Sequence, residues 1–172
     1  RSIDFNFTGS TDAGLSIAAT AAKHLTDYKF ELGGNDPFIV FEDADMDLVV
    51  KEAEDQARNN RQCCTGSKRF LVHNSLKEEF IRRLSAELDK LVIGDPMDPK
   101  VNMGPMISER AARQVEEQVN LTVAQGARIV RGGKRNGAFY EPTILTDVAP
   151  DTDIARDMEV FGPVWPVIGF DT

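Results

Sequence analysis

The stretch FIVFEDADMDLVVKEAEDQARNNRQCCTGSKRFLVH, residues 38–73, decides the fold of this chain. It begins and ends with short apolar runs, 38–41 and 69–72, of the kind that form buried strands. Between them, aspartates supply helix N-caps, and apolar side chains recur at helical spacing at Met46, Val49, Val50, Ala53 and Ala57. A strand, a helix and a strand in this order predict two parallel strands joined by a helical crossover.

The same alternation continues on both sides of this stretch. Further strands are expected at residues 3–7, 28–32, 127–130, 142–145 and 163–167. The first two of these runs flank a helix with an apolar face formed by Leu15, Ala18, Ala19, Ala22 and Leu25. The sequence therefore predicts an α/β fold with three layers and a mainly parallel sheet.

Two more helices are expected in the second half. A capping box, Ser75 to Glu78, opens the first, and its inward side chains are Leu76, Phe80, Leu84, Leu88 and Leu91. Ser108 opens the second and Gly126 ends it, with Ala111, Val115, Val119 and Val123 facing inward. Residues 93–107, which are rich in proline, predict an ordered loop between the two helices.

Composition excludes several classes of protein. With 172 residues, 41% of them hydrophobic, the chain suits one globular domain or at most two, and not a disordered or fibrous protein. Its 28 acidic against 20 basic residues, a net charge of −8, argue against a nucleic-acid partner and a membrane surface. Two adjacent cysteines cannot form a disulfide framework, which favours a cytoplasmic location. Because the chain opens at Arg1, we expect it to be part of a longer protein.

Cys64 is the residue best suited to covalent chemistry. A thiolate is the strongest nucleophile among side chains, and Lys68 and Arg69 lie close enough in sequence to favour it. The competing interpretation is a small buried hydrophobic residue, since free cysteine is often buried. Cys63 is expected to point elsewhere and to be structural. A redox pair of the two thiols is disfavoured, because adjacent cysteines form only a strained ring.

Glu31 and residues 9–14 each allow two interpretations. Glu31 ends a predicted strand, where a partly buried carboxylate can act as a general base, but for this residue taken alone an exposed glutamate on an edge strand is the preferred interpretation. The segment 9–14 can hold a phosphate on its backbone N–H groups or form only a tight turn. It lacks one glycine of the dinucleotide fingerprint.

No metal site is expected. Aspartates 43, 45 and 47 match calcium-loop positions, but Leu48 stands where that loop requires glycine, so helix capping is the preferred interpretation. His24 and His73 are isolated from each other and from the cysteines.

Five motifs occur in a characteristic order. They are Phe7-Thr8-Gly9-Ser10-Thr11, Glu31-Leu32-Gly33-Gly34, Gln62-Cys63-Cys64, Gly94-Asp95-Pro96 with Gly104-Pro105, and Glu159-Val160-Phe161-Gly162-Pro163. In this order they resemble the NAD(P)-dependent aldehyde dehydrogenase family, and the resemblance covers the middle-to-late part of a full-length member. Residues 35–40 are most similar to the succinate-semialdehyde dehydrogenase branch.

The resemblance implies roles for particular residues. Cys64 would attack the aldehyde, giving a thiohemiacetal and then a thioester, and Glu31 would activate the water that hydrolyses the thioester. Thr8, Gly9 and Ser10 would lie along the nicotinamide and pyrophosphate of NAD or NADP, the choice between them being left open. Glu159 and Phe161 would hold the nicotinamide ribose.

The resemblance also implies an organisation. Residues 1–34 would end a cofactor-binding domain, and residues 35–172 would form a catalytic domain truncated at its C-terminal end. The parent enzyme would be a cytoplasmic homo-oligomer that takes a small aldehyde, with no metal, nucleic acid or membrane. We expect Cys64 and Glu31 near the carboxyl ends of strands, facing one cleft.

Arg58 is a candidate for substrate binding, and two departures from the family pattern bear on whether the chain is catalytically active. Arg58 would pair with the distal carboxylate of succinate semialdehyde, or else point to solvent. Arg61 replaces the glycine of the family's Gly-Gln-x-Cys motif, which strains the loop if that position needs a positive φ. One residue is also missing between Glu31 and Cys64. The alternative to an enzyme is therefore an inert fragment or pseudoenzyme domain that serves only assembly.

Overall fold

The computed structural model describes residues 4–172, which divide between Gly34 and Asn35 into two compact units. In the first unit, strands β1 (Phe5–Thr8) and β2 (Tyr28–Glu31) are parallel and are joined by helix α1 (Thr11–Ala22). Ser10 caps this helix by accepting a hydrogen bond from the Ala13 N–H. Part of the strand predicted over 3–7 lies outside the described residues, because Ile3 is not among them.

The second unit is built on a five-stranded sheet with the order β3-β4-β9-β8-β5. The strands are β3 (Pro37–Val40), β4 (Arg69–His73), β5 (Arg128–Arg131), β8 (Thr143–Thr146) and β9 (Val164–Phe170). Neighbouring strands are parallel except for β5, which pairs antiparallel with β8 at one edge. The prediction of an α/β fold with a mainly parallel sheet is therefore confirmed.

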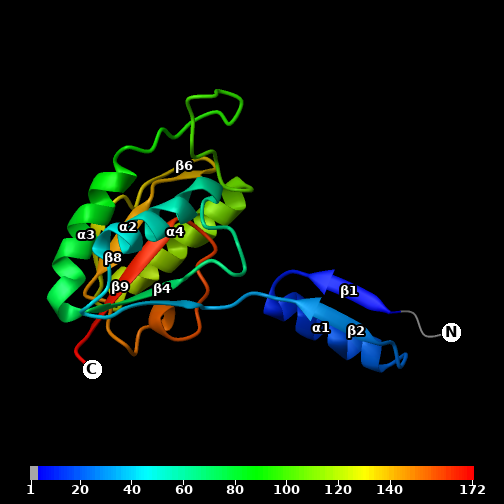
Figure 1. Ribbon diagram of the computed structural model, residues 1–172. Helices are drawn as coiled ribbons and strands as arrows, with labels where there is room; N and C mark the ends of the chain where they lie inside the picture. The colour runs from blue at the N-terminus through cyan, green and yellow to red at the C-terminus, as the bar shows by residue number, and fades with distance from the viewer. Residues whose placement is uncertain (1–3) are drawn as a thin grey trace. The chain divides into compact units, whose positions relative to one another are not determined.

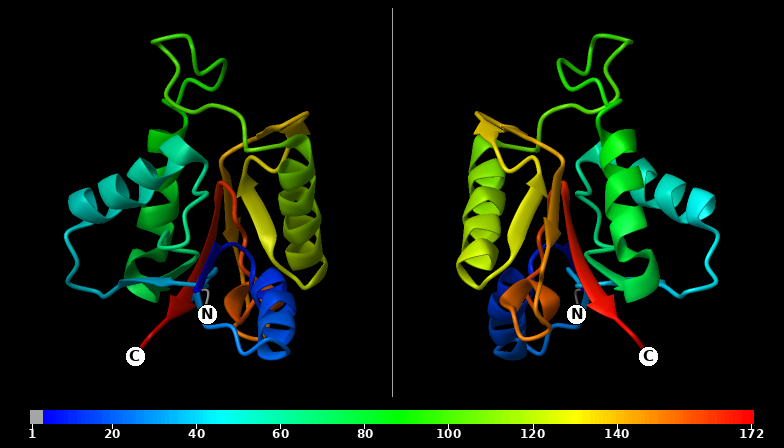
Figure 2. Two further views of the ribbon diagram at one scale, coloured as in Figure 1. Left: turned by 90° about the vertical axis from the view of Figure 1, so that its right-hand side faces the viewer. Right: turned by 90° about the vertical axis from the view of Figure 1, so that its left-hand side faces the viewer.

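Helices cover both faces of this sheet, as Figures 1 and 2 show. Helices α2 (Met46–Asp55) and α3 (Asn74–Leu88) pack on one face over a core that includes Phe70, Phe80 and Trp165. Helix α4 (Glu109–Ala124) packs on the other face with Val115 and Val119 inward. The remaining elements are short: the 3₁₀ helices η1 (Gln56–Asn59) and η2 (Asp153–Ala155), and the hairpin of β6 (Arg135–Asn136) and β7 (Phe139–Tyr140).

Three details of the helices differ from the sequence prediction. Leu25 is wrong as a residue of the apolar face of the first helix, because it lies beyond the end of α1 and is 92% exposed. The capping box at Ser75 is wrong: α3 begins one residue earlier, and the His73 imidazole accepts the Ser75 N–H at 3.3 Å. Val123 is also wrong as an inward residue of α4, because it is 38% exposed and the neighbouring Thr122 is buried instead. The Thr122 hydroxyl donates to the Gln118 carbonyl, which satisfies its hydrogen-bonding capacity inside the core.

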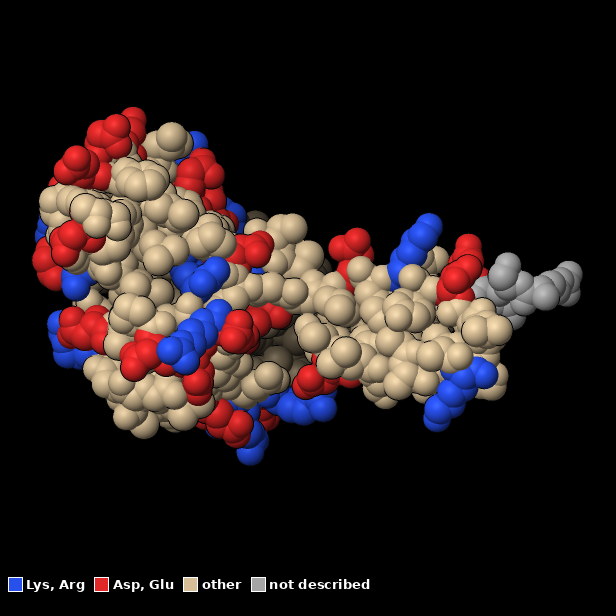
Figure 3. Space-filling view, turned by 90° about the horizontal axis from the view of Figure 1, so that it is seen from below, with Lys and Arg blue, Asp and Glu red and all other residues tan. Residues whose placement is uncertain are grey.

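The surface is of mixed charge. Acidic and basic side chains are interspersed on the face shown in Figure 3, in keeping with the net charge of −8. Within residues 4–172, each helix is too short or too polar to cross a membrane.

Candidate functional site

The two cysteines lie on a segment that we call the cysteine loop, residues 60–68, between η1 and β4. Helix α2 carries the chain back from the carboxyl end of β3, so the loop enters β4 from its amino end. The expectation that Cys64 lies near the carboxyl end of a strand is therefore wrong. The physical reason is that the crossover between two parallel strands must return the chain to the amino ends of the strands before the next strand begins.

The loop begins with two residues in the left-handed conformation, Asn60 (φ 56°) and Arg61 (φ 53°). The buried Asn60 amide donates to the carbonyls of Gly104 and Pro105 at 3.0 and 3.2 Å. The Gln62 side chain accepts the Ile107 N–H at 3.0 Å. The cysteine loop is thus held against the end of the 93–107 segment, which leads from α3 to α4.

Arg61 is enclosed by the core, although it carries a charge. It is 1% exposed, and its guanidinium carbon lies 4.9 and 4.8 Å from the ring centroids of Phe70 and Trp165. None of its three side-chain nitrogens has a hydrogen-bond partner among residues 4–172. Burial lowers the pKa of Arg61 to about 9. The condition named in the sequence analysis is met, because Arg61 has a positive φ of 53°, a conformation that strains the backbone of a residue other than glycine.

The two thiols differ in their surroundings. Cys64 is exposed, whereas Cys63 is half-buried and its sulfur lies 3.3 Å from the Thr65 hydroxyl. That hydrogen bond and, more weakly, the charge of Lys68 lower the pKa of Cys63. Both cysteines are free.

The basic residues expected to favour a Cys64 thiolate have other partners. Lys68 donates to main-chain carbonyls of the cysteine loop, at 2.7 Å to Cys63. The Arg69 guanidinium donates to the carbonyls of Asn35 and Ala155 at 2.7 and 3.2 Å. Neither cation donates a hydrogen bond to the Cys64 sulfur in the described part of the chain, so their effect on that thiol stays a prediction.

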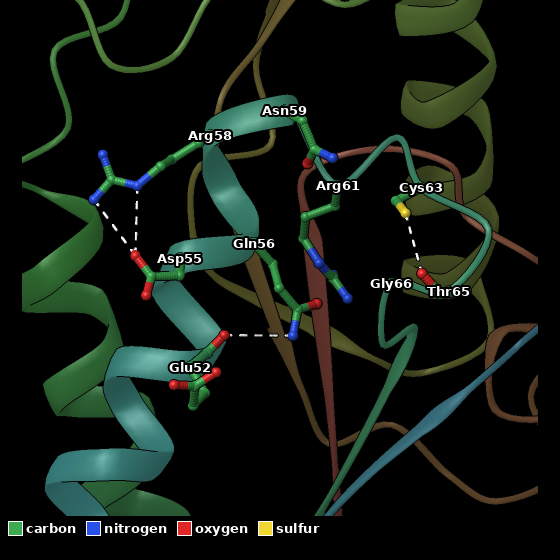
Figure 4. Close-up of a pocket in the computed structure, with 9 residues that line it drawn as sticks. All are labelled: Glu52, Asp55, Gln56, Arg58, Asn59, Arg61, Cys63, Thr65 and Gly66. Atoms are coloured by element: carbon green, nitrogen blue, oxygen red, sulfur yellow. Dashed lines mark hydrogen bonds and ion pairs between the residues drawn. The ribbon is translucent and has the colours of Figure 1, made fainter.

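A cavity of about 480 Å³ lies beside the loop, and Figure 4 shows its lining. The lining includes Arg58, Arg61, Cys63 and Thr65, with the carboxylates of Glu52 and Asp55. Arg58 is 56% exposed, pairs with Asp55 at 3.4 Å, and points away from Cys63. The cavity thus contains the predicted substrate arginine, but it is lined by Cys63 rather than by Cys64.

Glu159 and Phe161 approach the same loop through Lys68. A Glu159 carboxylate oxygen lies 3.7 Å from the Lys68 nitrogen, and the Phe161 ring centroid lies 5.7 Å from it. That oxygen is buried and has no hydrogen-bond partner in the described part of the chain. Lys68 was considered in the sequence only as a charge near Cys64. Its position inside a polar loop gave no sign that it would be buried.

The first unit brings together the other four predicted residues. Thr8 pairs with Glu31 across the two strands, and the Gly9 N–H donates to the Glu31 carbonyl at 3.0 Å. A Cβ on Gly9 would lie 2.5 Å from the Phe7 ring, so a larger residue here would require that ring to move. Ser10 follows as the cap of α1, and all four residues are exposed. Because Glu31 and Cys64 belong to different units, their meeting in one cleft stays a prediction.

Metal binding has no support in residues 4–172, where acidic, histidine and cysteine side chains do not gather in groups of three or more. Asp43 lies in the turn before α2 and Asp47 in its first turn, while Asp45 caps the helix by accepting the N–H groups of Asp47 and Leu48. The capping interpretation of these aspartates is confirmed at Asp45.

Comparisons with known proteins match nearly the whole chain to one family. A family model described as "Aldehyde dehydrogenase family" matches residues 4–172. Succinate-semialdehyde dehydrogenase [NADP(+)] of Deinococcus radiodurans is 44% identical over 163 residues, which are 92% of this chain and 34% of the relative. Glutarate-semialdehyde dehydrogenase of Pseudomonas aeruginosa is 42% identical over 95% of this chain and 35% of its own.

Solved structures of aldehyde dehydrogenases are also similar to this chain. The crystal structure of betaine aldehyde dehydrogenase from Staphylococcus aureus in complex with NAD+ superposes with a TM-score of 0.93 at 37% identity, covering 98% of this chain and 35% of that one. The chain therefore spans about a third of the length of these relatives.

Proposed function

The chain belongs to the aldehyde dehydrogenase family, and we propose on that basis that the protein carrying it oxidises an aldehyde through Cys64. The observation that carries the proposal is the exposed, free thiol of Cys64 on a loop whose backbone is held at both ends. An exposed sulfur can meet a small aldehyde, and a fixed backbone keeps it in one place while the substrate is oriented.

The chemistry that we propose is covalent catalysis by Cys64. The Cys64 thiolate forms a bond to the aldehyde carbon, giving a thiohemiacetal. A nicotinamide cofactor, when bound, supplies the acceptor for the hydride that leaves this carbon, and a thioester on Cys64 remains. Glu31 then takes a proton from water, the water oxygen attacks the thioester carbon, and the bond to sulfur breaks to release the carboxylic acid and the Cys64 thiolate, after which Glu31 gives its proton to solvent.

Two groups of residues suit a nicotinamide dinucleotide. The buried Glu159 oxygen lacks a hydrogen-bond partner among the described residues, so it can accept bonds from the hydroxyls of a ribose. Thr8, Gly9 and Ser10 precede the N-terminus of α1, where backbone N–H groups and the helix dipole favour phosphate. We propose that these residues, with Phe161, hold NAD or NADP.

Succinate semialdehyde is the substrate that we propose. Two of the relatives above are named for semialdehydes that end in a carboxylate. Arg58 lines the cavity beside the cysteine loop, and its pair with Asp55 is exposed to water. Exposed pairs of this kind contribute little to stability, so the guanidinium is free to exchange Asp55 for a substrate carboxylate.

The test is a comparison of the two cysteines in the complete protein that carries this chain. Cys64→Ala should abolish aldehyde-dependent formation of reduced nicotinamide, whereas Cys63→Ala should retain it. Mapping of iodoacetamide adducts by mass spectrometry should find Cys64 labelled before Cys63, because Cys64 is exposed and Cys63 is half-buried. Activity that survives Cys64→Ala, or exclusive labelling of Cys63, would refute the assignment.

A second candidate function rests on Arg61. A strained backbone and a buried guanidinium without hydrogen bonds stand three positions before Cys64, where they can misplace the thiol. An inert domain that serves assembly would follow. In that case the wild-type protein produces no reduced nicotinamide with any aldehyde, and Arg61→Gly restores the activity.

A further inference from the structure

Lys68 is a buried cation that ends the cysteine loop. It is 3% exposed, and its ammonium group donates to the carbonyls of Gly66 at 2.6 Å, Cys63 at 2.7 Å and Cys64 at 3.5 Å. An ammonium group has three N–H donors, so the loop carbonyls account for all of them. The main-chain carbonyls of both cysteines thus accept hydrogen bonds from the same ammonium group.

The same ammonium group faces the motif that contains Glu159 and Phe161. Glu159 lies beyond hydrogen-bond distance at 3.7 Å, and the Phe161 ring lies over the cation at 5.7 Å. The other charged groups that act on Lys68 are Arg61, Asp36 and the Cys63 thiol. Burial lowers the pKa of Lys68, and Glu159 opposes this shift. The cation therefore lies between the loop that carries the thiols and the carboxylate proposed to hold the cofactor ribose.

We propose that Lys68 is a positioning residue that holds the carbonyls of Cys63, Cys64 and Gly66 in register and couples the Cys64 thiol to Glu159. The inference rests on the proposed function, since it concerns the placement of that nucleophile and that cofactor residue. Lys68 touches neither thiol in this arrangement, and its effect on Cys64 passes through the main chain.

Two substitutions separate the charge from the hydrogen bonds. Lys68→Met keeps most of the side-chain length and removes every donor, while Lys68→Gln keeps two N–H donors without the charge. Lys100→Met is the matched control, because Lys100 is exposed in the 93–107 segment. The readout is the rate of iodoacetamide alkylation at Cys64, measured by mass spectrometry on the complete protein, with circular dichroism to confirm folding.

Lys68→Met should slow alkylation of Cys64 about tenfold, since several charge-assisted hydrogen bonds to the loop are lost together. Lys68→Gln should give an intermediate rate, and Lys100→Met should match the wild type. If Lys68→Met does not fold, Lys68→Gln decides the question by itself. A rate in the folded Lys68 variants equal to that of Lys100→Met would overturn the inference.

The coupling to Glu159 has its own readout. Glu159→Gln should change the Cys64 alkylation rate about threefold in the wild-type background and leave it unchanged in the Lys68→Met background, or in Lys68→Gln if the former does not fold. Equal effects in both backgrounds would show that the two residues act independently and would overturn the coupling. Failure of the proposed function looks different: the wild type would then lack aldehyde oxidation that depends on Cys64, whatever the Lys68 variants do.

Discussion

Arg61 combines two energetic costs at one position. A non-glycine residue at φ 53° is strained by about 1 kcal/mol, and a buried guanidinium without hydrogen bonds costs more. Contact with the faces of Phe70 and Trp165 offsets part of this, at about 2 kcal/mol for a desolvated cation. The residue therefore fills space between the sheet and α2 at the expense of its own hydration.

Arg61→Met should raise the free energy of unfolding at neutral pH by about 1–2 kcal/mol, because an apolar side chain of similar length replaces a buried, unpaired charge. Urea unfolding of the 172-residue chain measures it. Arg110→Met, at an exposed position on α4, is the control and should change stability by less than about 0.5 kcal/mol. A loss of stability at Arg61→Met would mean that the aromatic contacts outweigh the desolvation.

The same variant has a pH signature. The folded pKa of Arg61 is lowered to about 9, so above that pH the folded state releases a proton that the unfolded state keeps. Wild-type stability arising from this group therefore rises as pH increases through 9, and below 9 the full penalty is present. The stability advantage of Arg61→Met should shrink between pH 8 and about 10.5, whereas a constant difference would show that Arg61 stays protonated.

Arg58 tests the choice of substrate. In the complete protein, Arg58→Ala should lower kcat/KM for succinate semialdehyde about 10- to 150-fold through a higher KM, and spare an uncharged aldehyde such as butanal. The reason is loss of one charge-assisted pair with the distal carboxylate. No change with either aldehyde would leave Arg58 as the solvent-facing partner of Asp55, and equal losses on both would indicate a disturbed cysteine loop.

At the scale of elements, α2 sets where the cysteine loop starts. Its cap is Asp45, and its carbonyl at Ala53 accepts the Trp165 indole N–H at 3.0 Å, which ties the helix to β9. Asp45→Ala should lower the free energy of unfolding by about 1 kcal/mol, and the adjacent Asp43→Ala, which removes no cap, should not. Thermal unfolding of the two variants side by side measures it, and equal effects would contradict the capping role.

The elements could be predicted because their signals are local. The apolar runs at 38–41 and 69–72 and the caps at Asp45 and Ser108 are each visible within a few residues. The errors arose where tertiary contacts decide: His73 caps α3 from the end of β4, and Thr122 turns inward because its hydroxyl can bond within its own helix. Such choices depend on packing partners that a pattern of apolar residues does not contain.

In the candidate site, too, local motifs could be predicted and tertiary contacts could not. Cys64, Glu31 and the Thr8-Gly9-Ser10 turn are short motifs, and the structure places the last two together in the first unit. The burial of Arg61 depends on Trp165, and the surroundings of Lys68 depend on Glu159, each some ninety to a hundred residues away. Contacts over such separations could not be read from spacing along the chain.

In the whole molecule, the proposed mechanism needs residues from both units. Under that proposal, the thioester on Cys64 in the second unit is hydrolysed only if Glu31 in the first unit activates water. Removal of that base should let the reaction begin and then stop at the thioester. The site can thus be interrupted at a defined covalent state.

The most direct measurement is therefore intact-peptide mass spectrometry of Glu31→Gln in the complete protein, incubated with succinate semialdehyde and NAD+ or NADP+. We expect a succinyl group on the peptide that contains Cys64, together with a single burst of reduced nicotinamide and no further turnover. Cys64→Ala in the same background should carry no acyl group. Absence of the acyl group from Cys64 while aldehyde oxidation continues, or its appearance on Cys63, would refute Cys64 as the nucleophile.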